Sequence, residues 1–132
     1  MMSKWETEPD FLEFIDEDTR YKCFIGRHST LGHLCGYVEL PKEHKLYDNI
    51  SEESIYNNFN LEVHGGVTFT GRKQFKKQNI IIDNVIGFDC AHCGDFSPYG
   101  NLMYYEYEEY RDIGYVINEC KKLAKQLKRL EQ

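Results

Sequence analysis

Hydrophobic and polar positions alternate along the first third of the chain in the way typical of β-strands. Pro41 ends the last of these segments, because proline lacks the amide hydrogen that a strand ladder needs. Short runs of turn-forming residues separate the segments. The pattern predicts a meander of antiparallel strands at 11–15, 20–27 and 33–40.

The middle of the chain predicts a short helix followed by a β-hairpin. Residues 51–59 are the helix candidate, since they begin with serine and two glutamates, which suit the start of a helix. Residues 61–71 predict a strand that Gly65 and Gly66 interrupt. A glycine pair in a strand indicates a bulge or a close backbone approach. The dense apolar run at 80–89 predicts a central, well-covered return strand.

The clearest helix lies near the C-terminus. Apolar residues recur there at helical spacing, at Ile113, Val116, Ile117, Cys120, Leu123, Ala124, Leu127 and Leu130. Lysine and arginine fill the other faces, and Cys120 lies on the apolar stripe and is predicted to be core. The sequence therefore predicts an α+β fold in a single domain, 1–132, with an antiparallel sheet of about four to five strands packed against a long C-terminal helix.

Composition narrows the class of protein. The 132 residues are 41% hydrophobic and 14% aromatic, enough for one core. The net charge of −6 argues against general nucleic-acid binding, which needs a basic surface. The longest apolar run is three isoleucines, far short of a membrane helix, and no signal peptide is visible. An odd number of cysteines, five, then favours a reduced, cytoplasmic setting with thiols free or metal-bound.

Candidate chemistry gathers in "GFDCAHCGD", residues 87–95. Asp89, His92 and Asp95 are spaced by three, so a helical turn would let them converge. They could hold a divalent metal, perform acid–base chemistry with an oriented His92, or form a polar turn that only packs. The Cys90-x-x-Cys93 pair is a weak zinc signal, because the chain offers no second cysteine pair.

His64, just before the glycine pair, is the further candidate ligand. In a regular hairpin, position 64 would lie opposite the low 80s and not beside Asp89. A metal site with four ligands therefore requires a geometry in which His64 reaches the 89–95 cluster. His44 is either another ligand or an ordinary loop histidine.

Four segments together resemble a family of small uncharacterised proteins from bacteriophages and other mobile elements. They are "CGYVELPKEHKLY", "VHGGVTF", "IGFDCAHCGD" and "YVINECKKLAKQL", and the resemblance covers about residues 33–127. It touches His44, His64, Asp89, Cys90, His92 and Asp95, whereas position 93 is open in the family pattern. The resemblance implies a phage-like setting, in which small acidic proteins often inhibit host defence, anti-CRISPR proteins among them.

We therefore expect a small cytoplasmic protein of a bacterial host cell, with a divalent metal, zinc first, held by His64, Asp89, His92 and Asp95. It would inhibit a host defence component, such as an RNA-guided CRISPR nuclease, by binding a basic protein surface, without direct nucleic-acid or membrane contact. The alternative is a metal-dependent hydrolase, or a sequestering protein, that acts on a nucleotide signal. A closed four-ligand site favours the first function, and an open coordination position or a deep pocket beside His92 favours the second. The third possibility is that the 89–95 turn only packs.

Overall fold

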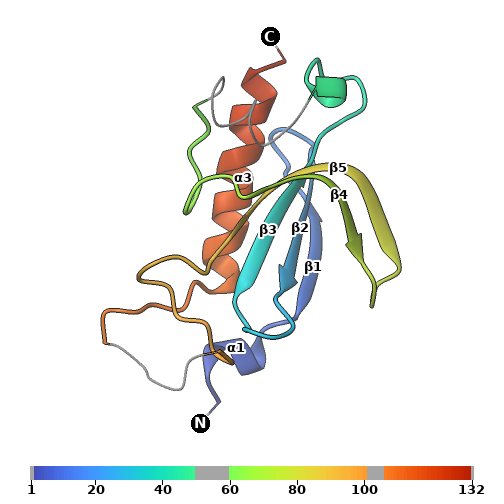
Figure 1. The fold of residues 1–132 in the computed structure, drawn as a ribbon. Helices are drawn as coiled ribbons and strands as arrows, with labels where there is room; N and C mark the ends of the chain where they lie inside the picture. Colours follow the sequence, from blue (N-terminus) through green and yellow to red (C-terminus); the bar gives the residue numbers. More distant parts are fainter. Residues whose placement is uncertain (1, 50–59, 101–105, 132) are drawn as a thin grey trace.

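The computed structural model describes residues 2–49, 60–100 and 106–131. Five antiparallel strands form one sheet in the order β1-β2-β3-β5-β4, and one long helix crosses one face of it (Figure 1). The elements are α1 (Lys4–Thr7), β1 (Phe11–Ile15), β2 (Lys22–Arg27), β3 (Leu34–Glu39), the 3-10 turn η1 (Tyr47–Asn49), β4 (Phe69–Phe75), β5 (Ile80–Asp89) and α3 (Ile113–Arg129). No helix in the described ranges is long and apolar enough to cross a membrane.

The predicted α+β architecture is confirmed, with one strand displaced. The meander, the return strand and the C-terminal helix form close to their predicted bounds. The strand predicted at 61–71 is wrong, because β4 begins at Phe69. The reason is that Gly65 and Gly66 have φ angles of +68° and +83°, which turn the chain out of an extended conformation. The helix predicted at 51–59 lies outside the described residues.

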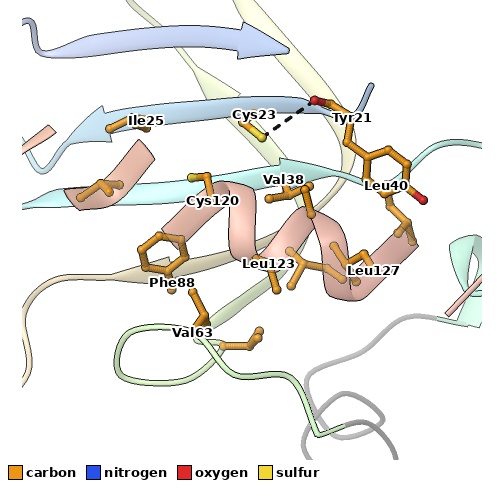
Figure 2. Close-up of a cluster of buried hydrophobic side chains, with 14 of the residues drawn as sticks. Tyr21, Cys23, Ile25, Val38, Leu40, Val63, Phe88, Cys120, Leu123 and Leu127 are labelled. Atoms are coloured by element: carbon orange, nitrogen blue, oxygen red, sulfur yellow. Dashed lines mark hydrogen bonds between the residues drawn. The ribbon is translucent and has the colours of Figure 1, made fainter. Parts of the chain in front are cut away.

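The main core lies between the sheet and α3. Asp112 caps the helix by accepting a hydrogen bond from the amide of Tyr115. The apolar stripe of α3 then packs on β2, β3 and β5, as Figure 2 shows for Cys120, Leu123 and Leu127. Each of these three side chains is completely buried. Burial of this kind, at about 1.5–3 kcal/mol for a large apolar side chain, is the principal force that holds the helix on the sheet.

The opposite face of the sheet is concave. The rings of Phe11, on edge strand β1, and Phe75, on edge strand β4, are 5.0 Å apart between centroids. Residues on the two edges of a five-stranded sheet can meet only if the sheet rolls up. A register shift between Gly71 and Lys73 in β4 supplies local curvature, and the β4–β5 hairpin bends accordingly in Figure 1. Phe75 also stacks on Phe24, so aromatic rings cover the concave face of the sheet.

A substitution at Gly36 tests how closely the sheet and α3 pack. A Cβ there would lie 2.5 Å from the Phe88 ring and 2.8 Å from the Cys120 sulfur. We therefore expect Gly36→Ala to lower the free energy of unfolding by about 1–3 kcal/mol, measured by urea denaturation. Gly114→Ala is the matched control, because its Cβ would meet Asp112 Oδ1 at an ordinary 3.6 Å. Equal stability of the two variants would contradict the prediction.

Candidate functional site

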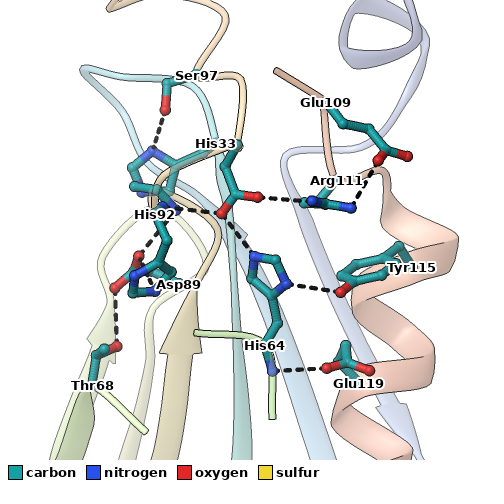
Figure 3. A network of polar contacts seen from close by, with 12 residues as sticks. His33, His64, Thr68, Asp89, His92, Ser97, Glu109, Arg111, Tyr115 and Glu119 are labelled. Atoms are coloured by element: carbon teal, nitrogen blue, oxygen red, sulfur yellow. Dashed lines mark hydrogen bonds and ion pairs between the residues drawn. The ribbon is translucent and has the colours of Figure 1, made fainter. Parts of the chain in front are cut away.

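A buried carboxylate, Asp95, accepts hydrogen bonds from His64, His92 and Arg111. Figure 3 shows these three partners in a polar network beside α3. Asp95 Oδ1 accepts from Arg111 Nε at 2.8 Å. Its Oδ2 accepts from His64 Nε2 at 2.7 Å and from the His92 amide at 3.0 Å. Burial alone would raise the pKa of Asp95, but these hydrogen bonds outweigh it and hold the pKa below its usual value. Asp95 is therefore a fully paired anion.

His64 does reach the 89–95 cluster, and α3 holds it there. Its Nδ1 lies 2.8 Å from the Tyr115 hydroxyl, which donates to it when Nε2 carries the proton. Its backbone amide donates to Glu119 Oε1 at 2.8 Å. Residues 115 and 119 are one helical turn apart on the same side of α3. The helix that closes the core thus also fixes the orientation of His64.

Gly65 lets the two histidines come together. The His92 imidazole lies across Gly65, and a Cβ at that position would be 2.1 Å from the ring. The positive φ of Gly65 is a second reason for glycine. Gly66 has a positive φ as well, but nothing lies within 4 Å of where its Cβ would be. The close approach expected of the glycine pair is therefore real, and its partner is His92.

His92 forms the second histidine–carboxylate pair, with Asp89. Its Nε2 is buried and lies 3.2 Å from Asp89 Oδ1, although not in hydrogen-bonding geometry. Asp89 is held in turn by Thr68, whose hydroxyl donates to Oδ2 at 3.0 Å, and by the amide of Ala91, which donates to Oδ1 at 3.0 Å. With Nε2 facing Asp89, the ring's other nitrogen, Nδ1, makes no hydrogen bond to any described residue.

A cavity of about 470 Å³ opens beside this pair on the concave face of the sheet. His92, Asp89 and Thr68 line one side of it, and Tyr37 and Phe69 contribute aromatic surface. The volume lies within the roughly 300–1,000 Å³ typical of ligand sites. The combination of apolar walls with a few converging polar groups is also typical of such sites.

Two further histidines line the same cavity from the β2–β3 connection. The rings of His28 and His33 stack with centroids 4.8 Å apart. Burial, and then the neighbouring His28, lower the pKa of His33, so His33 is neutral at pH 7. Its Nδ1 lies 3.4 Å from the Ser97 hydroxyl. The cavity therefore presents imidazole nitrogens that can donate or accept hydrogen bonds.

The four residues predicted to bind metal form two pairs. His64 pairs with Asp95 and His92 pairs with Asp89, and the two imidazole centroids are 5.9 Å apart. Among the described residues, no three His, Cys, Asp or Glu side chains are arranged to hold a metal ion. Both nitrogens of His64 and both oxygens of Asp95 already make hydrogen bonds. A zinc site at these four residues stays a prediction.

The remaining candidate ligands lie apart from one another. Cys90 is buried while Cys93 is exposed, and both are free thiols. Burial raises the pKa of Cys90, which keeps it protonated. His44 is buried at the other end of α3, where Nε2 lies 2.8 Å from the carbonyl oxygen of Leu127. His44 therefore anchors the C-terminal end of the helix and takes no part in the site.

Sequence reasoning missed the residues that hold the site together: Thr68, Arg111, Tyr115 and Glu119, and the cavity histidines His28 and His33. The spacing of Tyr115 and Glu119, one turn apart on a polar side of the helix, was a usable signal. The two histidines flank a turn and carry no pattern of their own. Only the pairing of β3 with β5, which sets Cys35 opposite Asp89, brings that turn to the cluster.

Comparisons with protein-family models, curated proteins and solved structures find no match for this chain. The resemblance to a phage protein family therefore stays a prediction.

The two glycines allow the contact with His92 to be separated from backbone strain. Gly66→Ala adds a Cβ into open space at a positive φ, so we expect it to cost about 1–2 kcal/mol of unfolding free energy. Gly65→Ala adds the same strain and also displaces the His92 ring, so it should cost more. It should also shift the NMR signals of the His92 imidazole, which Gly66→Ala leaves in place. Identical spectra and stabilities for the two variants would contradict the close contact between Gly65 and the His92 ring.

The Asp95–Arg111 pair predicts a pH dependence. Because the folded pKa of Asp95 is lowered, its contribution to stability is present above the unfolded pKa of about 3.9 and is lost as pH falls through the folded pKa. Arg111→Gln moves the folded pKa of Asp95 back up. We therefore expect the variant to be less stable by about 1–3 kcal/mol at pH 7, with the difference shrinking below about pH 4.

Urea denaturation between pH 2 and 8 measures this difference. Lys125→Gln is the control, since it breaks an exposed ion pair with Asp18 that should contribute under about 1 kcal/mol. If the stability difference between Arg111→Gln and the wild type stays constant with pH, the ionisation of Asp95 is not its cause.

Proposed function

We propose that this protein captures a small nucleotide in the cavity beside His92 and thereby sequesters it in the cytoplasm of a bacterial host cell. The observation that carries the proposal is the cavity itself, which brings imidazoles, a hydroxyl and aromatic rings to one place. A cavity beside His92 favours nucleotide capture over a metal-stabilised inhibitor, because the inhibitor would have a closed four-ligand site instead. Sequestration of a nucleotide signal would block a host defence response without any contact with a host protein.

The aromatic wall suits a nucleobase. The rings of Tyr37 and Phe69 lie 5.7 Å apart, edge to face, and both line the cavity. Stacking of one base on such a surface contributes about 1–3 kcal/mol in single-stranded nucleic-acid complexes, whichever base it is. This wall would supply affinity, and the polar groups opposite would supply orientation.

The polar wall suits the sugar and phosphate. Asp89 faces Nε2 of His92, which favours the proton on that nitrogen and leaves Nδ1 as an acceptor for a ligand hydroxyl. In the protonated ring, Nδ1 donates to a phosphate oxygen instead. Asp89 is fixed by Thr68 and Ala91, so the carboxylate that faces the imidazole is in place before a ligand arrives.

The two histidine–carboxylate pairs then have different tasks. Asp95 is buried and His64 is largely covered, and both ring nitrogens and both carboxylate oxygens make hydrogen bonds, so the pair serves as the support for the loop that carries His92. His92 and Asp89 are each about one third exposed, which leaves them accessible to a ligand. Inhibition of a CRISPR nuclease through a basic protein surface stays a prediction that no observation here favours.

Incubation of the protein with cyclic and linear nucleotides tests the proposal. Chromatography of the bound and free fractions should recover the nucleotide unchanged and bound to protein. His92→Gln and Tyr37→Leu should each weaken retention about tenfold, since each removes one good interaction. Cys93→Ser is the control, because Cys93 is exposed beside the cluster but does not line the cavity.

The same assay has two outcomes that would overturn the proposal. Recovery of cleaved nucleotide would make the protein a hydrolase, and absence of retention would remove nucleotide capture altogether. Retention that disappears with a chelator would instead assign the binding to a metal at His64, Asp89, His92 and Asp95.

A further inference from the structure

A second cavity, of about 430 Å³, adjoins the first on the concave face. The two cavities share three lining residues, His28, Cys35 and Tyr37. The second cavity extends from there towards Phe11 on β1 and Phe75 on β4, where the rolled sheet brings its two edges together. The concave face therefore holds two adjoining cavities, which we call the two compartments of a trough.

Lys73 lines the second compartment, next to Tyr37, which both compartments share. Its ammonium nitrogen lies 5.0 Å from the ring centroid of Tyr37, which lines both compartments. It lies 5.7 Å from the ring of Phe69, which lines only the first, and 5.3 Å from the ring of Phe75, which lines only the second. Cation–π contacts with these three neighbouring rings restrain the side chain, so less entropy is lost when it binds an anion.

The second compartment is basic although the chain as a whole is acidic. Lys76 and Lys77, at the tip of the β4–β5 hairpin, line the second compartment together with Lys73. None of these three lysines forms an ion pair with any residue in the described ranges. The carboxylate in that compartment, Asp10, is neutralised by Arg27 Nε at 2.7 Å. The net positive charge is complementary to an anion.

The second compartment also has an aromatic wall. The ring of Phe75 contacts Phe11 at 5.0 Å and Tyr37 at 5.6 Å, both edge to face. Each compartment thus offers an aromatic surface, and the Lys73 ammonium group lies close to rings of both. Each volume is near the lower end of the range for ligand sites, so each suits one nucleoside.

We infer that the ligand of this trough is a dinucleotide, with one base in each compartment and its linking phosphate on Lys73. This inference rests on the proposed capture of a nucleotide beside His92 and names the class of that nucleotide. A mononucleotide would fill one compartment only. A long single strand is disfavoured, because beyond the trough it would meet the surface of a chain with a net charge of −6.

Calorimetric titration with AMP, the linear dinucleotide ApA and cyclic di-AMP tests the inference. We expect at least one dinucleotide to bind about 10–100-fold more tightly than AMP, because it gains a second stacked base. Lys73→Met keeps the apolar part of the side chain and removes its charge. It should weaken dinucleotide binding about tenfold and lower the salt dependence of the affinity by about one phosphate contact.

Two further variants separate the compartments. Phe11→Leu should weaken dinucleotide binding and leave AMP unchanged, while His92→Gln should weaken both. Lys125→Met, on the outer surface of α3, is the charge-matched control and should have no effect. Thermal unfolding of each variant establishes that it is folded before titration.

The outcomes distinguish the two proposals. If AMP and the dinucleotides bind equally and Lys73→Met changes neither, the dinucleotide inference is wrong while nucleotide capture stands. If an oligonucleotide binds more tightly than any dinucleotide, the inference is also wrong, and the trough is a single-strand site. If nothing binds, both proposals fail.

Discussion

The structure depends on one buried carboxylate that must not be left without partners. Burying an unpaired charge costs several kcal/mol, so Asp95 is stable only where both of its carboxylate oxygens meet donors. Those donors come from three places in the chain: the loop before β4, the loop after β5, and the segment that leads into α3. Satisfying Asp95 therefore ties together three segments that lie outside the five-stranded sheet, two of which also meet in a single β-bridge between Asp95 and Glu109.

The concave side of the sheet follows from a separate constraint. A flat five-stranded sheet with one helix would leave Phe11, Phe24 and Phe75 exposed on its second face. Rolling the sheet lets these rings cover one another, because Phe75 then reaches both Phe24 and Phe11. The roll leaves hollows where the rings do not meet, and the polar cluster lies at the edge of one of them. The pairing of Asp95 and the mutual covering of the aromatic rings together produce an aromatic trough with a rigid polar end.

The sequence predicted this fold well and the site only in part, for a physical reason. Alternation and helical spacing report local burial, so the meander, β5 and α3 were accessible to pattern reasoning. The Gly65–Gly66 pair predicts either a bulge or a close backbone approach, but the partner of the close approach, His92, depends on a turn that leaves the sheet. The pairing of His64 with Asp95 likewise depends on tertiary geometry, since a regular hairpin would have kept them apart. Rolling of the sheet leaves no periodic trace in the sequence, which is why the trough was not foreseen.

The double attachment of α3 has a consequence for how the molecule moves. One side of the helix is the core, and another side holds His64 through Tyr115 and Glu119. Loops around binding sites often open by themselves with a small free-energy cost, but a loop fastened to a core helix has no such freedom. Amide hydrogens at His64 and Asp95 should therefore exchange with solvent at rates close to those of α3 itself. On this view the polar end of the trough belongs to the most slowly opening unit of the protein, and any flexibility that admits a ligand resides in the β4–β5 hairpin.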